Sequence, residues 1–152
     1  MTVTYPSLTL SRYTNVIFNE LTLSADEKIA ITKLRFKQNG SLPDGNLRSL
    51  NLVNYQTQTA LAIVDGPTNG IVEFIMTPDA SKPDHGLVVS GGIYDVVGNI
   101  ITPNVGAGNK PNIKLDLEAS SSIVAFDYNN MTRVANLKAV SFPLTGPTIT
   151  TF

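Results

Sequence analysis

Apolar and polar residues alternate over short stretches of this chain, and a period of two is typical of β-strands that bury one face. No stretch keeps the three-to-four-residue spacing of an amphipathic helix. The alternation predicts strands at residues 2–10, 15–23, 28–37, 50–55, 59–64, 70–76, 87–89, 93–101, 112–119, 122–128, 136–142 and 148–152.

Some of the predicted strands change phase partway along. In residues 28–37 the apolar side chains move from odd to even positions after Ile31. A β-bulge or an edge crossing between Thr32 and Lys33 would return both sets to one core. Pro6 interrupts the first predicted strand, and because it has no N–H it belongs at an edge or where a strand passes between sheets. Bent strands of this kind are typical of two-layer sandwiches.

Turn residues separate the strands at short intervals. The turn pairs are Asn39-Gly40, Asp44-Gly45, Asp65-Gly66, Asn69-Gly70, Gly91-Gly92, Gly98-Asn99 and Gly146-Pro147. Gly, Asn and Asp adopt the backbone angles that tight turns need, and Pro fixes its own. The pattern predicts one all-β domain over residues 1–152, an antiparallel β-sandwich of immunoglobulin-like or jelly-roll-like type with little or no helix. The polar stretches 77–86 and 103–111 are expected to be its longest loops.

Composition narrows the function classes. Charged residues make up only 15% of the 152-residue chain, and the net charge is −1, whereas charged residues average about 25% in globular proteins. Such a surface has no summed field to attract nucleic acid or an anionic membrane. No apolar run reaches the ~18 residues of a membrane span. We therefore predict no nucleic-acid partner and no membrane insertion. The absence of Cys excludes disulfides and thiolate chemistry.

The sequence offers few groups for catalysis. His85 is the only histidine, and no Gly-x-Ser-x-Gly motif supplies a nucleophile, so we expect a surface loop residue. Lys114, Asp116 and Glu118 alternate with apolar residues, which predicts one solvated strand face rather than an acid–base pair. Residues 105–111 contain glycines and a lysine but lead into a strand, whereas a phosphate-binding loop opens a helix. We predict no enzyme, with no catalytic or cofactor-binding residues.

Two oxygen-rich turns could bind a structural calcium ion. They contain Asp44 and Asp127, and Ca²⁺ accepts carboxylate, amide and backbone oxygens. Asp, Asn and Gly also occur in turns for their backbone preferences alone. No other metal or cofactor is predicted. Carbohydrate binding usually relies on aromatic platforms, and this chain has no Trp and five dispersed Tyr residues.

Both ends of the chain carry β-branched and aromatic residues, where chains usually fray into polar tails. The residues concerned are Val3 and Tyr5 within residues 1–10, and Ile149 and Phe152 within residues 146–152. Such ends pair either with the domain's own sheets or with a neighbouring subunit that accepts an added strand. We predict that at least one end is an assembly arm exchanged between subunits. The alternative is that both ends are ordinary edge strands.

A family resemblance rests on residues 21–61. They begin Leu-Thr-Leu-Ser-Ala-Asp-Glu-Lys-Ile-Ala-Ile-Thr-Lys-Leu-Arg-Phe and continue through Asn39-Gly40-Ser41 to Asn46-Leu47-Arg48-Ser49-Leu50-Asn51-Leu52. This pattern resembles the immunoglobulin-like sandwich modules of bacterial and archaeal surface proteins. Residues 86–97 are similar to a hairpin of those modules, and residues 113–125 to their closing strands. The resemblance implies a spacer, adhesive or surface-layer role without catalytic residues. Similar sandwiches occur as decorations on phages.

These observations together predict a non-enzymatic structural subunit of a larger assembly. The assembly would be a virion, with the chain as a head-decoration or tail protein, or an extracellular surface layer or filament at the cell surface. Its partners would be other copies of itself in a homo-oligomer, or a neighbouring structural protein. The alternative is a secreted adhesion module that binds a glycan or a protein through loops 77–86 and 103–111.

Overall fold

The computed structural model describes residues 8–9, 14–76, 87–101, 111–128, 132 and 144–150. Its strands are β1 (Leu8–Thr9), β2 (Val16–Gln38), β3 (Leu47–Asn54), β4 (Thr59–Val64), β5 (Ile71–Ile75), β6 (Leu87–Ile100), β7 (Asn112–Ile113), β8 (Leu115–Leu117), β9 (Ile123–Asp127), β10 (Leu144–Thr145) and β11 (Ile149–Thr150). The helical elements among these residues are two 3₁₀ turns, η1 (Asp44–Asn46) and η2 (Ser120–Ser122). The predicted all-β sandwich class is confirmed.

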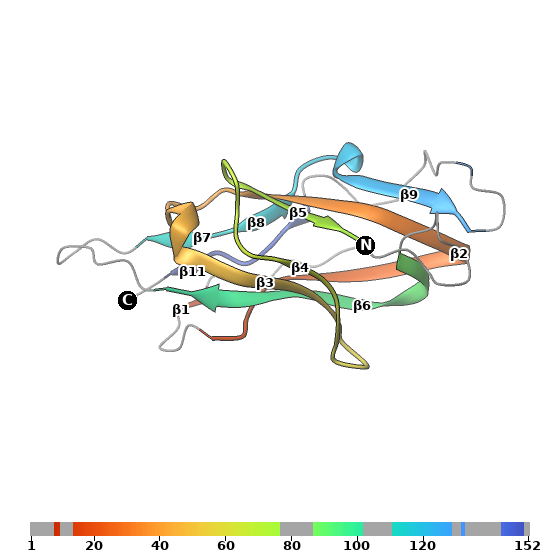
Figure 1. Cartoon of the computed structure of the whole chain (residues 1–152), viewed down its shortest axis with the longest axis horizontal. Helices are drawn as coiled ribbons and strands as arrows, with labels where there is room; N and C mark the ends of the chain where they lie inside the picture. Colours follow the sequence, from red (N-terminus) through yellow and green to blue (C-terminus); the bar gives the residue numbers. More distant parts are fainter. Residues whose placement is uncertain are drawn as a thin grey trace.

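The long strand β2 contributes to both layers of the sandwich. Its residues 16–24 pair antiparallel with residues 91–98 of β6, and its residues 29–31 pair with residues 87–89. From Ser24 to Ile29 β2 advances five residues while β6 moves two, so β2 follows the longer path around a shared bend. Figure 1 shows β2 passing between the layers at the end of the molecule opposite β7 and β11.

The first layer consists of residues 16–24 of β2, residues 91–100 of β6, β3 and β4, in the order β2-β6-β3-β4. The second layer is built on residues 29–38 of β2, with β5 along one side and β9 and β8 along the other. β10 extends this layer beside β8, and β1, β11 and β7 form a small separate sheet. The described strand pairs are antiparallel except β1 with β11.

The predicted bulge between Thr32 and Lys33 is confirmed. Ile31 lies opposite Ala125 of β9, and Lys33 lies opposite Val124, so Thr32 is the extra residue on β2. Because of this insertion, Ile31 before the bulge and Leu34 after it are both buried in the core, although their positions differ by three residues.

The core lies between the two layers. Its largest fully buried side chains include Phe18 from the first layer and Phe36 and Phe74 from the second. The rings of Phe36 and Phe74 meet edge to face, with centroids 6.0 Å apart and planes at 84°, an arrangement that favours aromatic packing beyond simple burial. Around them pack Leu21, Ile31, Leu34, Leu47, Leu50, Leu52, Ile113, Leu115 and Leu117.

Some predicted boundaries were wrong. Gly91-Gly92 was expected to be a turn between two strands, but both residues lie inside β6, where they pair with Ser24 and Leu23 at the bend. Gly92 has φ +151°, a backbone angle that favours glycine. Residues 112–119 divide into β7 and β8, and β10 was not predicted. Pro6 and residues 136–142 lie outside the described residues.

The opposite faces of β5 provide a test of the register. Phe74→Ala should lower the free energy of unfolding by about 3–5 kcal/mol, because it removes a fully buried ring. The adjacent Ile75 is 68% exposed, so Ile75→Ala should change the monomer's stability by less than about 0.5 kcal/mol. Urea unfolding of both variants measures the difference, and equal losses would contradict the register.

Candidate functional site

The outward side chains of the first layer form a surface that we call the first-layer face. The strand register sets Ile17 beside Val97, Val97 beside Asn51, and Asn51 beside Ile63. Ile17 is 43% exposed and Ile63 72% exposed. The centre of this face consists of Ile17, Glu20, Thr22, Asn51, Val53, Tyr55, Ile63, Ile93, Asp95 and Val97. None of these ten residues is Lys, Arg or His; Arg48 lies at the end of the same face, opposite Asn99, and pairs with Asp65 at 3.7 Å.

A groove of about 430 Å³ opens in this face. Its lining consists of Asn15, Ile17, Asn51, Val53, Tyr55, Gln58, Asp95 and Val97. The strands β2, β6 and β3 supply its floor, because residues at alternate positions point away from the core. The groove therefore combines apolar walls, side-chain amides, one aromatic ring and one carboxyl group.

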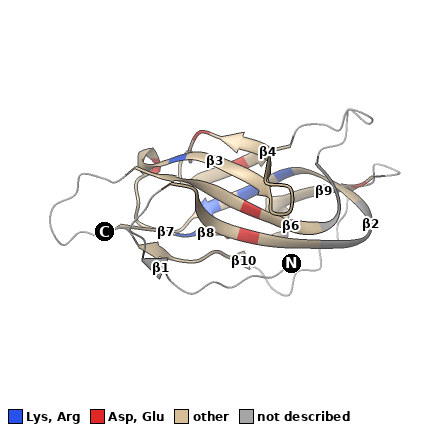
Figure 2. Ribbon diagram, turned by 90° about the horizontal axis from the view of Figure 1, so that it is seen from below, with Lys and Arg blue, Asp and Glu red and all other residues tan. Residues whose placement is uncertain are grey.

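Asp95 is the buried acid of this groove. It is only 4% exposed, and its Oδ1 has no hydrogen-bond partner. Glu20 lies directly across on β2, and in Figure 2 red segments lie side by side on β2 and β6. Burial raises the pKa of Asp95 to about 7, and the hydrogen bond and charge of Glu20 add to the increase. The two carboxyls are the only charged groups among the ten residues at the centre of the first-layer face.

The turn between β3 and β4 forms one rim of the groove. Asn54 Oδ1 accepts hydrogen bonds from the backbone N–H groups of Gln56 and Thr57 at 2.9 and 3.2 Å. Gln58 has φ +56°, and its Nε2 donates to the Tyr55 carbonyl at 2.7 Å. These local bonds hold the turn in one conformation and leave the Tyr55 ring exposed beside the groove.

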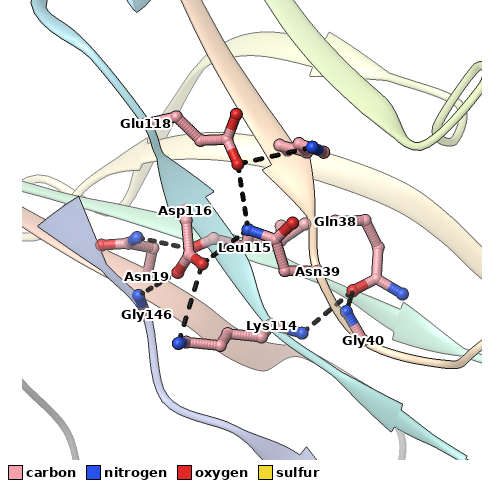
Figure 3. Close-up of polar contacts among 10 residues, drawn as sticks. Asn19, Gln38, Asn39, Gly40, Lys114, Leu115, Asp116, Glu118 and Gly146 are labelled. Carbon is pink, nitrogen blue, oxygen red and sulfur yellow. Dashed lines mark hydrogen bonds and ion pairs between the residues drawn. The ribbon is translucent and has the colours of Figure 1, made fainter. Parts of the chain in front are cut away.

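The predicted solvated face of Lys114, Asp116 and Glu118 is wrong for Asp116, which is only 3% exposed. Its Oδ1 accepts the N–H of Gly146 at 3.0 Å, and its Oδ2 accepts from Asn39 Nδ2 at 2.8 Å (Figure 3). Lys114 Nζ lies 3.8 Å from the same carboxylate. Asp116 is covered because the chain after β10 crosses it, and a period-two pattern cannot reveal such a crossing.

The same region links the two layers. Asn19 points inward from β2 and donates from Nδ2 to the Leu115 carbonyl at 2.8 Å. Gly146 fills the space between the two layers, where an added Cβ would lie 2.7 Å from the Leu115 carbonyl oxygen. This polar cluster thus uses its hydrogen-bonding groups within the chain, and its role is structural.

Of the two calcium candidates, Asp44 uses its Oδ2 to accept the N–H of Gly70 at 2.9 Å, which holds the turn between β4 and β5. The backbone N–H of Asp127 donates to the Thr132 carbonyl at 2.8 Å. Over the part of the chain that the structure describes, no three His, Cys, Asp or Glu side chains gather in a way that could hold a metal ion. The structural calcium remains a prediction.

Most of the other predicted positions fall outside the described residues. These are Val3, Tyr5, His85 and Phe152, loop 77–86, and loop 103–111 apart from Pro111. Ile149 is described: it is fully buried, and β11 pairs with β1 on one side and β7 on the other. No helix in the described ranges has the length and apolar character needed to cross a membrane.

The sequence interpretation overlooked Glu20 and Asp95. A signal was present, since Asp95 stands between Ile93 and Val97 at positions that share one strand face. The pairing of Asp95 with Glu20 depends on the register between β2 and β6, including a bulge between Ile17 and Asn19. That register could not be read from either strand alone.

Comparison with protein-family models, with curated proteins and with solved structures gave no match.

Asp116 and Glu118 test the structural role of the polar cluster. Asp116→Ala should lower the free energy of unfolding by about 2–3 kcal/mol, because it removes a buried carboxylate that accepts two hydrogen bonds. Glu118→Ala removes an exposed partner of Lys37 and should cost less than about 1 kcal/mol. Denaturant titration at neutral pH measures the free energy of unfolding of both variants. A larger loss for Glu118→Ala would contradict the assignment.

The raised pKa of Asp95 predicts a pH-dependent stability. The folded state holds the proton up to about pH 7, whereas the ordinary value is 3.8. The protonated Asp95 therefore stabilises the folded state fully below pH 3.8. This stabilisation is lost as the pH rises to about 7, which lowers the free energy of unfolding by about 2–4 kcal/mol. Asp95→Asn cannot ionise and should not show it. As the pH rises from 4 to 8, the free energy of unfolding of Asp95→Asn should therefore increase relative to that of the wild type. A difference that does not change with pH would contradict the prediction.

Proposed function

We propose that this protein is a structural subunit that assembles with copies of itself, and that the first-layer face takes part in the contacts. The observation that carries the proposal is the character of this face. Ile17, Tyr55 and Ile63 are each more than 40% exposed on it, and the centre of the face has no Lys or Arg. Exposed apolar clusters of this kind usually mark interaction surfaces.

The free edge of the first layer supports the same function. β4 ends the strand order of this layer and pairs only with β3 among the described strands. Its sequence, Thr-Ala-Leu-Ala-Ile-Val, contains no charge and no proline. Soluble proteins commonly protect a free edge with Lys, Pro or a cover, because unpaired N–H and C=O groups recruit other strands. β4 therefore suits a contact with another subunit.

The kind of assembly follows from the rest of the chain. A neutral, charge-poor surface without Cys favours subunits that associate by packing and hydrogen bonding. A virion, with this chain as a head-decoration or tail protein, and an extracellular surface layer or filament both use such subunits. Strand exchange belongs to the same proposal. β1 and β11 already pair with each other at Leu8 and Ile149, and an exchanged arm would form this pairing with a neighbour instead.

A second candidate is a glycan-binding module. The groove presents the amides of Asn15, Asn51 and Gln58 next to Tyr55 and Asp95, and amides, carboxyls and aromatic rings together suit hydroxyl-rich ligands. This function would use the protein as a monomer. It also places the binding site on a sheet face rather than on loops 77–86 and 103–111.

The proposal predicts concentration-dependent assembly. Sedimentation velocity of the wild-type chain should show species larger than 16.3 kDa that increase with concentration. Ile63→Lys should shift the protein to monomer, because it places a charge on both the exposed face and the free edge.

The matched control is Ile101→Lys, which changes another exposed isoleucine just beyond β6 and should leave assembly unchanged. A wild-type chain that stays monomeric at every accessible concentration would refute self-assembly. A monomer that binds a glycan array through Tyr55 would establish the second candidate instead.

A further inference from the structure

The groove over Asp95 contains a buried acceptor, Oδ1 of Asp95, without a hydrogen-bond donor. Asp95 lines the groove and is only 4% exposed, and its Oδ1 has no hydrogen-bond partner among the described residues. An unpaired buried carboxyl oxygen costs free energy. Glu20 is itself an acid, and no Lys, Arg or His lines the described part of the groove. A cationic donor from outside the chain would satisfy this oxygen.

The opposite side of the sandwich carries cations. Lys33, Arg35 and Lys37 alternate along β2 with the buried Leu34 and Phe36, so they point outward from the second layer. We call this surface, with the outward residues of β5, the second-layer face. Its three cations outnumber the two carboxylates that pair with them, Glu73 and Glu118, whereas the centre of the first-layer face carries the carboxyls of Glu20 and Asp95 alone.

Arg35 is the unpaired member of this row. Lys33 Nζ lies 3.5 Å from Glu73, and Lys37 Nζ lies 3.6 Å from Glu118. No carboxylate of the described residues lies within 4.0 Å of the Arg35 guanidinium. Arg35 also lines two shallow grooves that both contain Ile71, one together with Glu118 and the other together with Glu73, which lies opposite Arg35 on β5.

We propose that the groove over Asp95 binds the guanidinium group of Arg35 from a second copy of this chain. The inference rests on the proposed self-assembly and names its contact. A guanidinium has five N–H donors in a planar fork and can satisfy Asp95 and Glu20 together. Tyr55 beside the groove offers an aromatic ring to the same cation. Ile71 and Ile75, which flank Glu73 on β5, face the apolar walls of the groove in such a contact.

Charge complementarity selects this contact over a symmetric one. Two first-layer faces packed on each other would bring two pairs of carboxyls together without a cation, and like charges at an interface oppose association. Docking the second-layer face on the first-layer face pairs opposite charges. Because each copy then offers both a donor and a groove, the contact is head-to-tail and generates rings or filaments rather than closed dimers.

The test uses two nearly isosteric variants that each remove one side of the contact. Arg35→Gln removes the donor, and Asp95→Asn removes the acceptor charge. Each should raise the dissociation constant of assembly at least about ten-fold, because a buried charge pair loses one partner. Arg48→Gln is the control, since Arg48 is an arginine of β3 that already pairs with Asp65 at 3.7 Å. Sedimentation velocity measures all four proteins, and thermal unfolding confirms that each is folded.

Mixing the two variants distinguishes a head-to-tail contact from other modes. The Arg35→Gln protein keeps its groove and the Asp95→Asn protein keeps its arginine, so an equimolar mixture should form heterodimers and nothing larger. Assembly of Arg35→Gln at wild-type strength would overturn the inference and leave self-assembly standing. A monomeric wild-type protein would overturn both, and glycan binding in the groove would then identify a different occupant.

Discussion

The fold depends on the continuous pairing of β2 with β6 around the bend that joins the two layers. Residues 16–24 and 29–31 of β2 both pair with β6, so one strand pair supplies hydrogen bonds to both sheets. The two strands bend together because β2 has extra residues there and β6 has Gly91 and Gly92. This pairing places Glu20 opposite Asp95 and directs Arg35 to the far side of the sandwich. The placement of these charged groups on the two outer faces is therefore a consequence of the bend.

Two buried aspartates show how the chain treats a carboxylate in different ways. Asp116 accepts hydrogen bonds from Gly146 and Asn39, so its burial is compensated inside the chain. Asp95 is buried to a similar degree, yet one oxygen has no partner and its pKa is raised to about 7. Asp116 stabilises the junction of strands around β8. Asp95 carries a cost in the isolated subunit that a suitable partner could remove, and this contrast makes it the functional candidate.

The sequence predicts those features that depend on local pattern. The phase change after Ile31 correctly placed the bulge at Thr32, because the core accepts only one face of each strand. The burial of Asp116 and the pairing of Glu20 with Asp95 depend on contacts between distant segments, which alternation within one strand does not specify. Gly91-Gly92 had the composition of a turn, but paired glycines also suit a bent strand. The candidate site was missed because a carboxylate between Ile93 and Val97 normally indicates solvent.

The scarcity of charge gives the remaining charges their significance. In a chain with 15% charged residues, Lys33 and Lys37 already have carboxylate partners among the described residues. On opposite faces, Arg35 has no such ion pair, and the buried Oδ1 of Asp95 has no hydrogen-bond partner. A highly charged surface would provide many alternative ion pairs and no preferred contact. Here, few other charged groups among the described residues lack a partner. In the proposed assembly, the attraction between Arg35 of one copy and Asp95 of the next would therefore set the orientation of the copies. The exposed isoleucines would then supply the buried area, and the single ion pair would select the direction of assembly.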